Sequence, residues 1–218
     1  MSFKYIYVIV EGQTEEKFIK EVLNKYLENF SIYIHPILIE TSRTPRRKHK
    51  GGLTTYSHLK NDILRLLHQS QIYKISTMID YYGLPDDFPG INSILNGNIY
   101  ERVDYLETKF SEDINNPKFV PYIQIHEFEA LLFSNIEGFK AIINDKAKIE
   151  KLEAIIDLFP NPEEINDGIE THPSKRIEKI YPEYNKVKDG LDIISYIGVE
   201  IILEKCKHFR KWIEKLKN

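Results

Sequence analysis

The chain has 218 residues, enough for one substantial hydrophobic core, and carries a net charge of −3 with 42% hydrophobic and 29% charged residues. This balance excludes a generally basic nucleic-acid-binding protein, so any such binding must use local patches. The single cysteine, Cys206, excludes a disulfide framework and a four-cysteine zinc site. No apolar run has the length of a membrane span, and the first residues indicate a strand rather than a signal peptide. We therefore expect a cytoplasmic protein with no membrane contact.

The first predicted element is a strand at 4–10, a run of β-branched and aromatic residues that ends in Glu11 and Gly12. Apolar residues then recur at helical spacing from Phe18 to Leu27, which predicts an amphipathic helix. A strand, a carboxylate, a glycine and a helix in this order describe the first crossover of a parallel α/β sheet. Because ligands of such sheets bind beyond the carboxyl ends of the strands, Glu11 is either a functional group or the start of a solvated turn.

A second strand is predicted at 31–40, where Pro36 indicates an edge strand or a bulge. The loop at 41–52 follows it and ends in paired glycines. Within this loop five basic residues occur in eight positions without an intervening acid: Arg43, Arg46, Arg47, Lys48 and Lys50. Basic side chains neutralise phosphates, and the glycines allow close backbone approach, so we interpret the loop as a nucleic-acid phosphate-binding segment. The alternative is a solvated charged loop.

Two further helix and strand pairs are predicted, a helix from an N-cap at Ser57, a strand at 73–79, a helix near 100–111 and a strand at 118–125. The third strand ends at Asp80, and the fourth is followed by His126, Glu127, Phe128 and Glu129. Three of the four predicted strands therefore carry an acid directly after the apolar run, a position that random surface acids would not favour. We interpret His126 as a structural residue, with a metal ligand or an acid as the alternative.

Glu11, Asp80, Glu127 and Glu129 are the candidate metal ligands. Oxygen ligands select a hard cation such as Mg²⁺ or Mn²⁺, which polarises a phosphodiester and activates water. Without a cation, converging acids repel one another or bind protons. Glu127 and Glu129 would share one face of a strand and diverge on a helix, where one would cap the helix and the other would bind metal. Glu127 is the favoured ligand.

From residue 135 onward the sequence is polar and helical, which divides the chain into an α/β core at 1–134 and a C-terminal helical subdomain at 135–218 packed on it. A core-facing stripe is predicted on the last helix, formed by Ile202, Cys206, Phe209, Ile213 and Leu216. A helix starting at Pro173 carries Lys175 and Arg176 in its first turn. Backbone N–H groups there favour anions, so these two residues form a second, smaller phosphate site or simply a capped helix with surface cations.

Several strings resemble the bacterial family called domain of unknown function 4276, which is related to the Toprim-like fold. The resemblance runs through essentially the whole chain, and its most specific strings are His126-Glu-Phe-Glu-Ala-Leu-Leu132 and Asp80-Tyr-Tyr-Gly-Leu-Pro85. The others are Val10-Glu-Gly-Gln-Thr-Glu-Glu16, the basic loop ending in Gly51-Gly52, Phe88-Pro-Gly90, Pro173-Ser-Lys-Arg176 and Ile197-Gly198.

The resemblance implies a Toprim-like α/β fold, with a mostly parallel four-stranded sheet flanked by helices and a C-terminal helical subdomain. In such domains the acid after the first strand is a general acid/base or metal ligand, and a later Asp-x-Asp pair binds Mg²⁺. Glu11 matches the first acid and Asp80 the first Asp of the pair, but Tyr82 stands where the second Asp is expected. Either Asp86 or Asp87 substitutes, or Glu127 and Glu129 complete the metal shell, or the site binds one ion.

The resemblance also implies a relative of the nucleases that accompany ATPases in bacterial defence loci. We therefore expect a Mg²⁺- or Mn²⁺-dependent nuclease or related phosphodiester-processing enzyme, with DNA or RNA as substrate and an ATPase as partner. Glu11, Asp80 and Glu127 would be its catalytic residues. One alternative is a non-catalytic nucleic-acid or ATPase-binding module on the same scaffold. Another is a phosphotransferase or hydrolase of small phosphorylated molecules.

Overall fold

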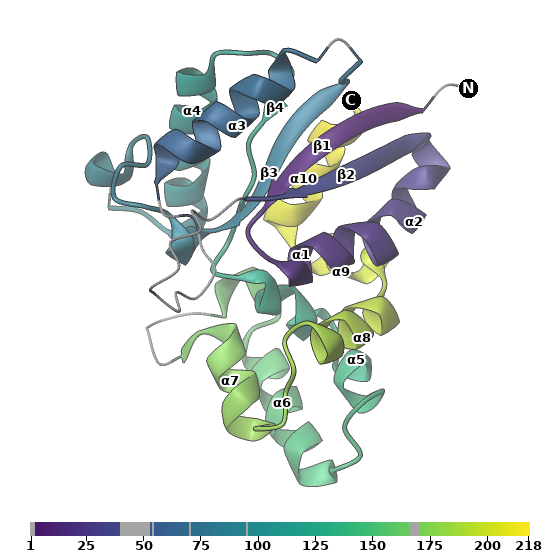
Figure 1. Cartoon of the computed structure of the whole chain (residues 1–218). Helices are drawn as coiled ribbons and strands as arrows, with labels where there is room; N and C mark the ends of the chain where they lie inside the picture. The colour runs from purple at the N-terminus through teal and green to yellow at the C-terminus, as the bar shows by residue number, and fades with distance from the viewer. Residues whose placement is uncertain (1–2, 40–52, 54, 70, 95, 166–170) are drawn as a thin grey trace, which may run out of the picture.

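The computed structural model describes residues 3–39, 53, 55–69, 71–94, 96–165 and 171–218 (Figure 1). Its strands are β1 (Lys4–Val10), β2 (Ile32–Leu38), β3 (Lys74–Asp80), β4 (Phe119–Val120) and β5 (Ile123–Gln124). Its α-helices are α1 (Gln13–Phe18), α2 (Asn24–Leu27), α3 (Tyr56–Leu67), α4 (Ile99–Ile114), α5 (Ile136–Lys140), α6 (Lys146–Leu158), α7 (Pro173–Ile180), α8 (Lys188–Ile197), α9 (Val199–Lys205) and α10 (Lys207–Lys217). The predicted basic loop lies outside the described residues.

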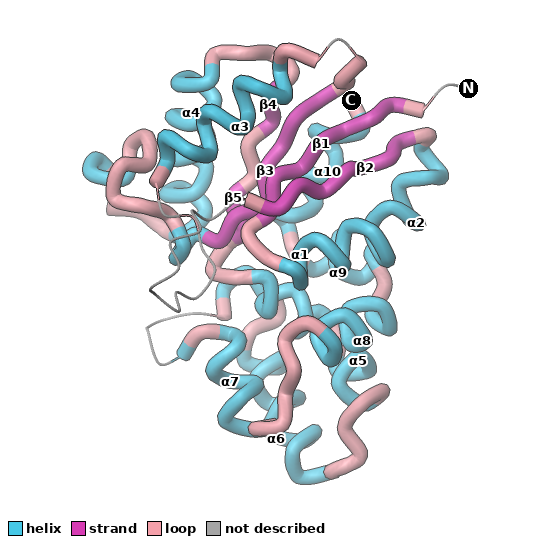
Figure 2. Tube along the Cα trace, viewed as in Figure 1, coloured by secondary structure: helices cyan, strands magenta, loops and turns pink. Residues whose placement is uncertain are grey.

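The strands form a parallel sheet in the order β2-β1-β3-β4, and β5 also pairs with β3 (Figure 2). Val10 at the end of β1 pairs with Leu38 of β2 and with Met78 of β3. The carboxyl ends of these three strands therefore lie at one edge of the sheet. The predicted α/β class with a parallel sheet flanked by helices is confirmed.

The fourth predicted strand, at 118–125, is wrong as a single element, because it is divided into β4 and β5. Pro121 has no N–H to donate between them. The backbone of Tyr122 is bound instead by the side chain of Thr77 on β3: the Tyr122 N–H donates to Thr77 Oγ1 (3.1 Å), which donates to the Tyr122 carbonyl (2.9 Å). A side chain thus replaces the backbone ladder for one residue.

Helices cover both faces of the sheet. Leu59 of α3 and Val103 of α4 pack with Ile9 and Ile75 in one hydrophobic cluster. Phe18 of α1, the helices that follow it and α10 pack with Val8 in the other. Figure 1 shows this layering, with α3 and α4 on one side of the strands and α1, α2 and α10 on the other.

The helix after β1 contains a π-helical segment at Ile19–Leu23, between α1 and α2. Asn24, directly after this segment, is buried and binds the backbone of Ile34 on β2 through both atoms of its amide (2.9 and 2.8 Å). β2 is an edge strand, as Pro36 predicts, and the Asn24 amide covers part of its free edge.

The predicted N-cap at Ser57 is wrong by two positions. The helix α3 begins at Tyr56, with Thr55 as its N-cap, and the side chain of Thr55 makes no capping hydrogen bond. The reason is that Asp87, from the loop after β3, accepts a hydrogen bond from the Tyr56 N–H (2.9 Å) and so fixes the start of the helix.

The C-terminal helices lie below the carboxyl edge of the sheet, except α10, which returns to the sheet face. The ring of Trp212 on α10 stacks on Tyr122 at 4.3 Å, and its Nε1 donates to Ser76 Oγ of β3 (2.8 Å). One hydrophobic cluster therefore includes residues of the sheet and of the C-terminal helices. The division of the chain at Ser134 stays a prediction.

The predicted stripe on the last helix is confirmed as core, because its five residues are buried. The helix itself is not continuous, since Cys206 has extended backbone angles and separates α9 from α10. Glu163 accepts hydrogen bonds from the N–H groups of His208 and Phe209 (both 2.9 Å) and so caps the start of α10. None of the described helices is both long and apolar enough to cross a membrane.

Candidate functional site

Glu11 and Asp80 lie side by side at the carboxyl edge of the sheet, because they end the neighbouring parallel strands β1 and β3. The Asp80 N–H donates to Glu11 Oε1 (3.2 Å). A Cβ atom added to Gly83 would lie 3.0 Å from both carboxylate oxygens of Glu11. The Glu11 carboxylate is therefore packed against the backbone of the turn that follows β3, where a larger residue than glycine would press on it.

Two further carboxylates contribute to the electrostatics of this site. Glu15 lies in the first turn of α1 and is 5% exposed, and Glu129 lies in the short 3-10 segment Phe128–Ser134 and is 0% exposed. The charges of both raise the pKa of Asp80. Glu129 Oε1 is buried and makes no hydrogen bond of ordinary geometry in the described part of the chain, and the buried Tyr184 hydroxyl close to this carboxyl is likewise unpaired. Such an orphaned acceptor is rare in folded proteins and marks a place where a cation or proton fits.

A lysine from the C-terminal half of the chain balances part of this charge. Lys186 lies just before α8, and its Nζ is 3.0 Å from Glu129 Oε2. Its charge also lowers the pKa values of Glu11 and Asp80. In return, although burial opposes it, the carboxylates of Glu129, Asp80 and Glu15 hold the pKa of Lys186 above its usual value.

The acids bind protons more tightly than exposed acids do. Burial raises the pKa of Glu11 to about 7, with the charge of Glu15 adding to the effect. Burial likewise raises the pKa of Glu129 to about 7, with Lys186 opposing it. The pKa of Asp80 is well above its usual value because of burial and the neighbouring Glu11. Near neutral pH this cluster therefore exchanges protons and has negative charge that a cation can neutralise.

Glu127 and Glu129 face different surroundings. Glu127 Oε1 accepts a hydrogen bond from the Ser174 N–H (2.6 Å) in the first turn of α7, where a carboxylate also complements the helix dipole. Glu129 instead faces Lys186 and the strand-end acids. The structure therefore gives Glu127 a helix-capping contact and brings Glu129 toward Asp80. Which of the two binds metal stays a prediction.

Tyr82, at the position of the expected second acid, belongs to a group of rings beside the site. Its hydroxyl is 2.7 Å from His126 Nδ1, and its ring lies edge-on to His172 at 4.5 Å. His126 is buried, has a φ of 64°, and burial lowers its pKa to about 4, so it is neutral at pH 7. A left-handed backbone at a buried histidine is strained, as residues beside functional sites often are.

The predicted phosphate-binding residues are only partly described. The loop residues Arg43, Arg46, Arg47, Lys48 and Lys50 lie outside the described part of the chain. Lys175 pairs with Glu178 (2.5 Å), and the Arg176 Nε donates to the Thr171 carbonyl (2.8 Å). Both remain near the first turn of α7, close in sequence to the helix start that Glu127 caps.

Sequence reasoning missed Glu15 and Lys186. Glu15 carried a usable signal, because it follows Glu11 by one helical turn and begins a helix that starts at the sheet edge. Lys186 carried none, since it lies in a polar stretch where lysines are common and reaches the site only through the packing of the C-terminal helices.

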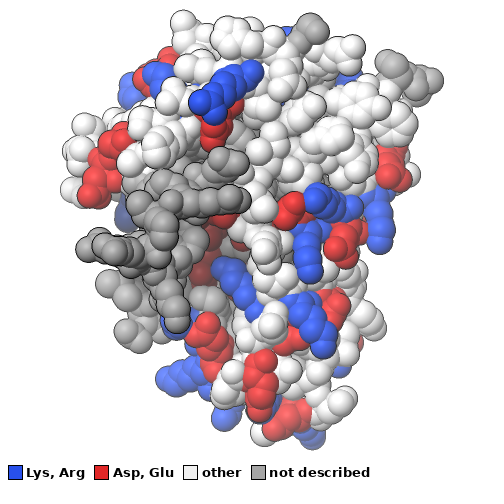
Figure 3. Space-filling model, viewed as in Figure 1, with Lys and Arg blue, Asp and Glu red and all other residues white. Residues whose placement is uncertain are grey.

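A separate group of three residues has its possible metal-binding atoms close enough together to hold one ion. Among the described residues, ligand atoms of Asp104, Glu107 and His208 lie within 4.8 Å of one another, and the strand-end acids form no such group of three. Figure 3 shows acidic side chains in a recess on the face of the molecule drawn there, with a basic side chain at the lower rim of the recess.

Comparison with known proteins identifies a family whose model matches this chain. The model of the family described as Domain of unknown function (DUF4276) matches residues 10–217. None of the curated proteins matches the sequence.

Among solved structures, the chain is similar to the C-terminal region of the Xanthomonas campestris pv. campestris OLD protein, with a TM-score of 0.40 in three determinations. The structure phased with iodine is 14% identical and the match covers 99% of this chain and 98% of that one. For the structure phased with mercury the values are 15%, 100% and 100%, and for the one phased with platinum 13%, 98% and 95%. A likeness of this degree assigns no activity.

Proposed function

Since the chain belongs to the DUF4276 family, whose description names no activity, we propose from its own residues that it is a Toprim-like, metal-dependent nuclease or related phosphodiester-processing enzyme. The observation that carries this proposal is that Glu11 and Asp80 lie side by side at the carboxyl edge of a parallel sheet. The backbone N–H of Asp80 donates a hydrogen bond to the Glu11 carboxylate. Ligands of open α/β sheets bind at this edge.

The donor set fits a hard dication. Glu11 and Asp80 would hold it, and Glu129, whose Oε1 makes no hydrogen bond of ordinary geometry among the described residues, would complete the protein ligands. Mg²⁺ is commonly held by one or two carboxylates together with water and substrate phosphates, so it does not need a tight group of three carboxylates, which the strand-end acids do not form among the described residues. When bound, Mg²⁺ or Mn²⁺ would polarise the phosphodiester and lower the pKa of a bound water.

The protein's own groups would supply proton transfer and phosphate binding. Glu11 would be either a ligand of the ion or the general acid/base, because a carboxylate bound to the ion carries no proton. Without an ion bound to it, its pKa of about 7 lets it accept and release a proton near neutral pH. Lys186 would neutralise a substrate phosphate near the acids. The basic residues at 43–50 would bind the phosphates of a DNA or RNA strand, and Lys175 and Arg176 would form a second, smaller phosphate site. An ATPase partner would act together with this chain.

The experiment is a cleavage assay on labelled single- and double-stranded DNA and RNA with Mg²⁺ or Mn²⁺, with and without the partner ATPase. Glu11→Gln should lower the rate by roughly 10²- to 10⁴-fold, the range for loss of a general acid/base, and Asp80→Asn should lower it by removing a charged ligand of the ion. Glu21→Gln, an exposed acid one helical segment away, is the matched control and should cleave at the native rate. Absence of cleavage under every condition, or equal rates in the three variants, contradicts the proposal.

One observation favours a second function. The Lys186 ammonium already neutralises Glu129, as expected if the scaffold had lost its metal and kept a charge-balanced cluster. The chain would then be a non-catalytic nucleic-acid or ATPase-binding module. Binding of a labelled oligonucleotide would weaken with rising salt and with the replacement of Arg46 and Arg47 by Gln, and it would need no metal. Binding that requires Mg²⁺ and is lost in Glu11→Gln would exclude this second function.

A further inference from the structure

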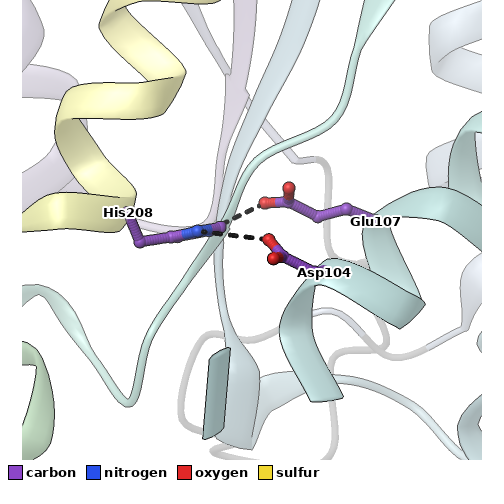
Figure 4. Close-up of side chains that lie close together, drawn as sticks. All are labelled: Asp104, Glu107 and His208. Carbon is purple, nitrogen blue, oxygen red and sulfur yellow. Dashed lines mark hydrogen bonds and ion pairs between the residues drawn. The ribbon is translucent and has the colours of Figure 1, made fainter. Parts of the chain in front are cut away.

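Three side chains outside the strand-end site meet at the β4 edge of the sheet. Asp104 and Glu107 lie on α4 and His208 lies on α10, and Figure 4 shows all three converging. The two helices cover opposite faces of the sheet, and they approach each other beyond the short strands β4 and β5. Because Asp104 and Glu107 are three residues apart, both project from the same face of α4.

The imidazole of His208 is held firmly in place. The side chain is 3% exposed, and its ring stacks on Tyr122 at 5.2 Å. The His208 N–H donates to Glu163, and Nε2 lies 2.9 Å from Glu107 Oε1. Glu107 is itself fixed, since Oε1 also accepts from the Ile123 N–H of β5 (2.9 Å).

The other ring nitrogen of His208 has no such partner. Nδ1 is buried and makes no hydrogen bond with any described residue, and it lies 3.9 Å from Asp104 Oδ1. This distance is too long for a hydrogen bond. A tetrahedral cation with bonds of roughly 2.0–2.2 Å spans about 3.4 Å between a nitrogen and an oxygen, so a shift of the half-exposed Asp104 side chain by about 0.5 Å would let one cation bridge the two atoms. An unpaired buried nitrogen costs stability unless something binds it.

The remaining carboxylate oxygens turn outward. Lys211 Nζ lies 3.8 Å from Asp104 Oδ2, and Lys215 Nζ lies 3.8 Å from Glu107 Oε2. Both lysines are more than half exposed, so they pair with the outer oxygens and leave the inner ones facing His208. A surface cavity of about 630 Å³, lined in part by these four side chains, opens beside the group.

We propose that Asp104 and His208 bind a borderline dication such as Zn²⁺, with Glu107 orienting the histidine. His208 Nδ1 and the Asp104 carboxylate are the ligands, and water from the adjacent cavity fills the open positions. Glu107 on Nε2–H gives the carboxylate–histidine–metal arrangement that fixes the tautomer of ligating histidines. The nitrogen donor selects Zn²⁺ over Mg²⁺, unlike the oxygen-only acids at the carboxyl edge. The metal would tie α4 to α10 across the sheet edge.

The test is a calorimetric Zn²⁺ titration of the metal-stripped full-length chain, followed by thermal unfolding with and without Zn²⁺. We expect saturable binding that raises the melting temperature. Asp104→Asn, a change at a half-exposed side chain that the fold should tolerate, should weaken Zn²⁺ binding at least 10-fold, and Glu107→Gln roughly 10- to 100-fold. His208→Gln should abolish it. Asp192→Asn, an exposed acid on α8, is the control and should bind Zn²⁺ like the native chain.

Two further results separate this site from the strand-end acids. Glu11→Gln should keep the Zn²⁺ binding, whatever that variant does to nucleic-acid cleavage. Circular dichroism of each variant establishes that it is folded before binding is measured. The proposal is overturned if the native chain binds no Zn²⁺, or if folded Asp104→Asn binds it as tightly as the native chain. Either result would mean that the three side chains form an ion-pair network with the two lysines and no metal site.

Discussion

Replacement of Glu129 by Gln should stabilise the protein at pH 8 and change its stability little at pH 5. Glu129 is fully buried, and its pKa is raised from 4.5 to about 7. The folded protein therefore holds a proton that the unfolded chain has already released at neutral pH. The stability due to this proton is fully present below pH 4.5 and is lost as the pH rises through 7. Glutamine has the same shape and does not ionise.

The size of the effect follows from the two pKa values. Each pKa unit corresponds to about 1.4 kcal/mol, so ionising this buried carboxyl costs the folded state roughly 3 kcal/mol of unfolding free energy above pH 7. The ion pair with Lys186 is already included, because its opposing effect does not bring the pKa back to 4.5. Lys186 keeps its charge in this variant, and it is 45% exposed and still close to the carboxylates of Asp80 and Glu15.

The assay is urea unfolding at pH 5 and pH 8 in the presence of a chelator. The free energy of unfolding of the native protein should fall relative to that of Glu129→Gln by roughly 3 kcal/mol between the two pH values. Glu150→Gln, an exposed acid on α6, should follow the native protein at both. If Glu129→Gln destabilises the chain equally at pH 5 and pH 8, burial does not disfavour the charged form and the reasoning is refuted.

Three other substitutions test separate contacts. Gly83→Ala would place a methyl group 3.0 Å from both oxygens of Glu11, so it should weaken Mg²⁺ binding and cleavage while circular dichroism stays native. Ser76→Ala removes the acceptor of the Trp212 indole N–H, and chemical unfolding should show a loss of about 1–3 kcal/mol. Glu127→Ala removes the carboxylate that caps α7 and should cost about 1 kcal/mol, whereas Glu127→Gln, which keeps an acceptor, should retain both stability and any metal binding.

The parallel sheet was predictable because its signals are local. Each of the first three strands is an apolar run that ends at a turn, and parallel pairing then brings the residues after β1 and β3 to one edge. Glu11 and Asp80 could be placed together on this basis alone. Pro121 was a sequence signal for the split of the fourth strand, but the contact of the Thr77 hydroxyl of β3 with the Tyr122 backbone could not be predicted.

The rest of the site depends on long-range packing. Whether Glu127 or Glu129 faces the strand-end acids is decided by the start of α7, whose Ser174 N–H binds Glu127. Lys186 comes to the acids only because α8 packs against α1 and the 3-10 segment that carries Glu129. No periodicity or spacing in the sequence encodes these approaches.

The charge balance of the strand-end site explains why a proton and a dication would compete for it. Burial holds the pKa values of Glu11 and Glu129 at about 7, so each is partly protonated near neutral pH, and Lys186 offsets part of the charge that remains. A dication would stabilise the ionised forms and displace the protons, so its affinity must rise with pH through 7. If protons alone neutralised the cluster, the stability of the protein would fall as the pH rises through 7, and added metal would not change it. Without a cation, full ionisation of these acids is unfavourable, and at neutral pH they are not fully protonated either. Both conditions suit a site that binds Mg²⁺ reversibly.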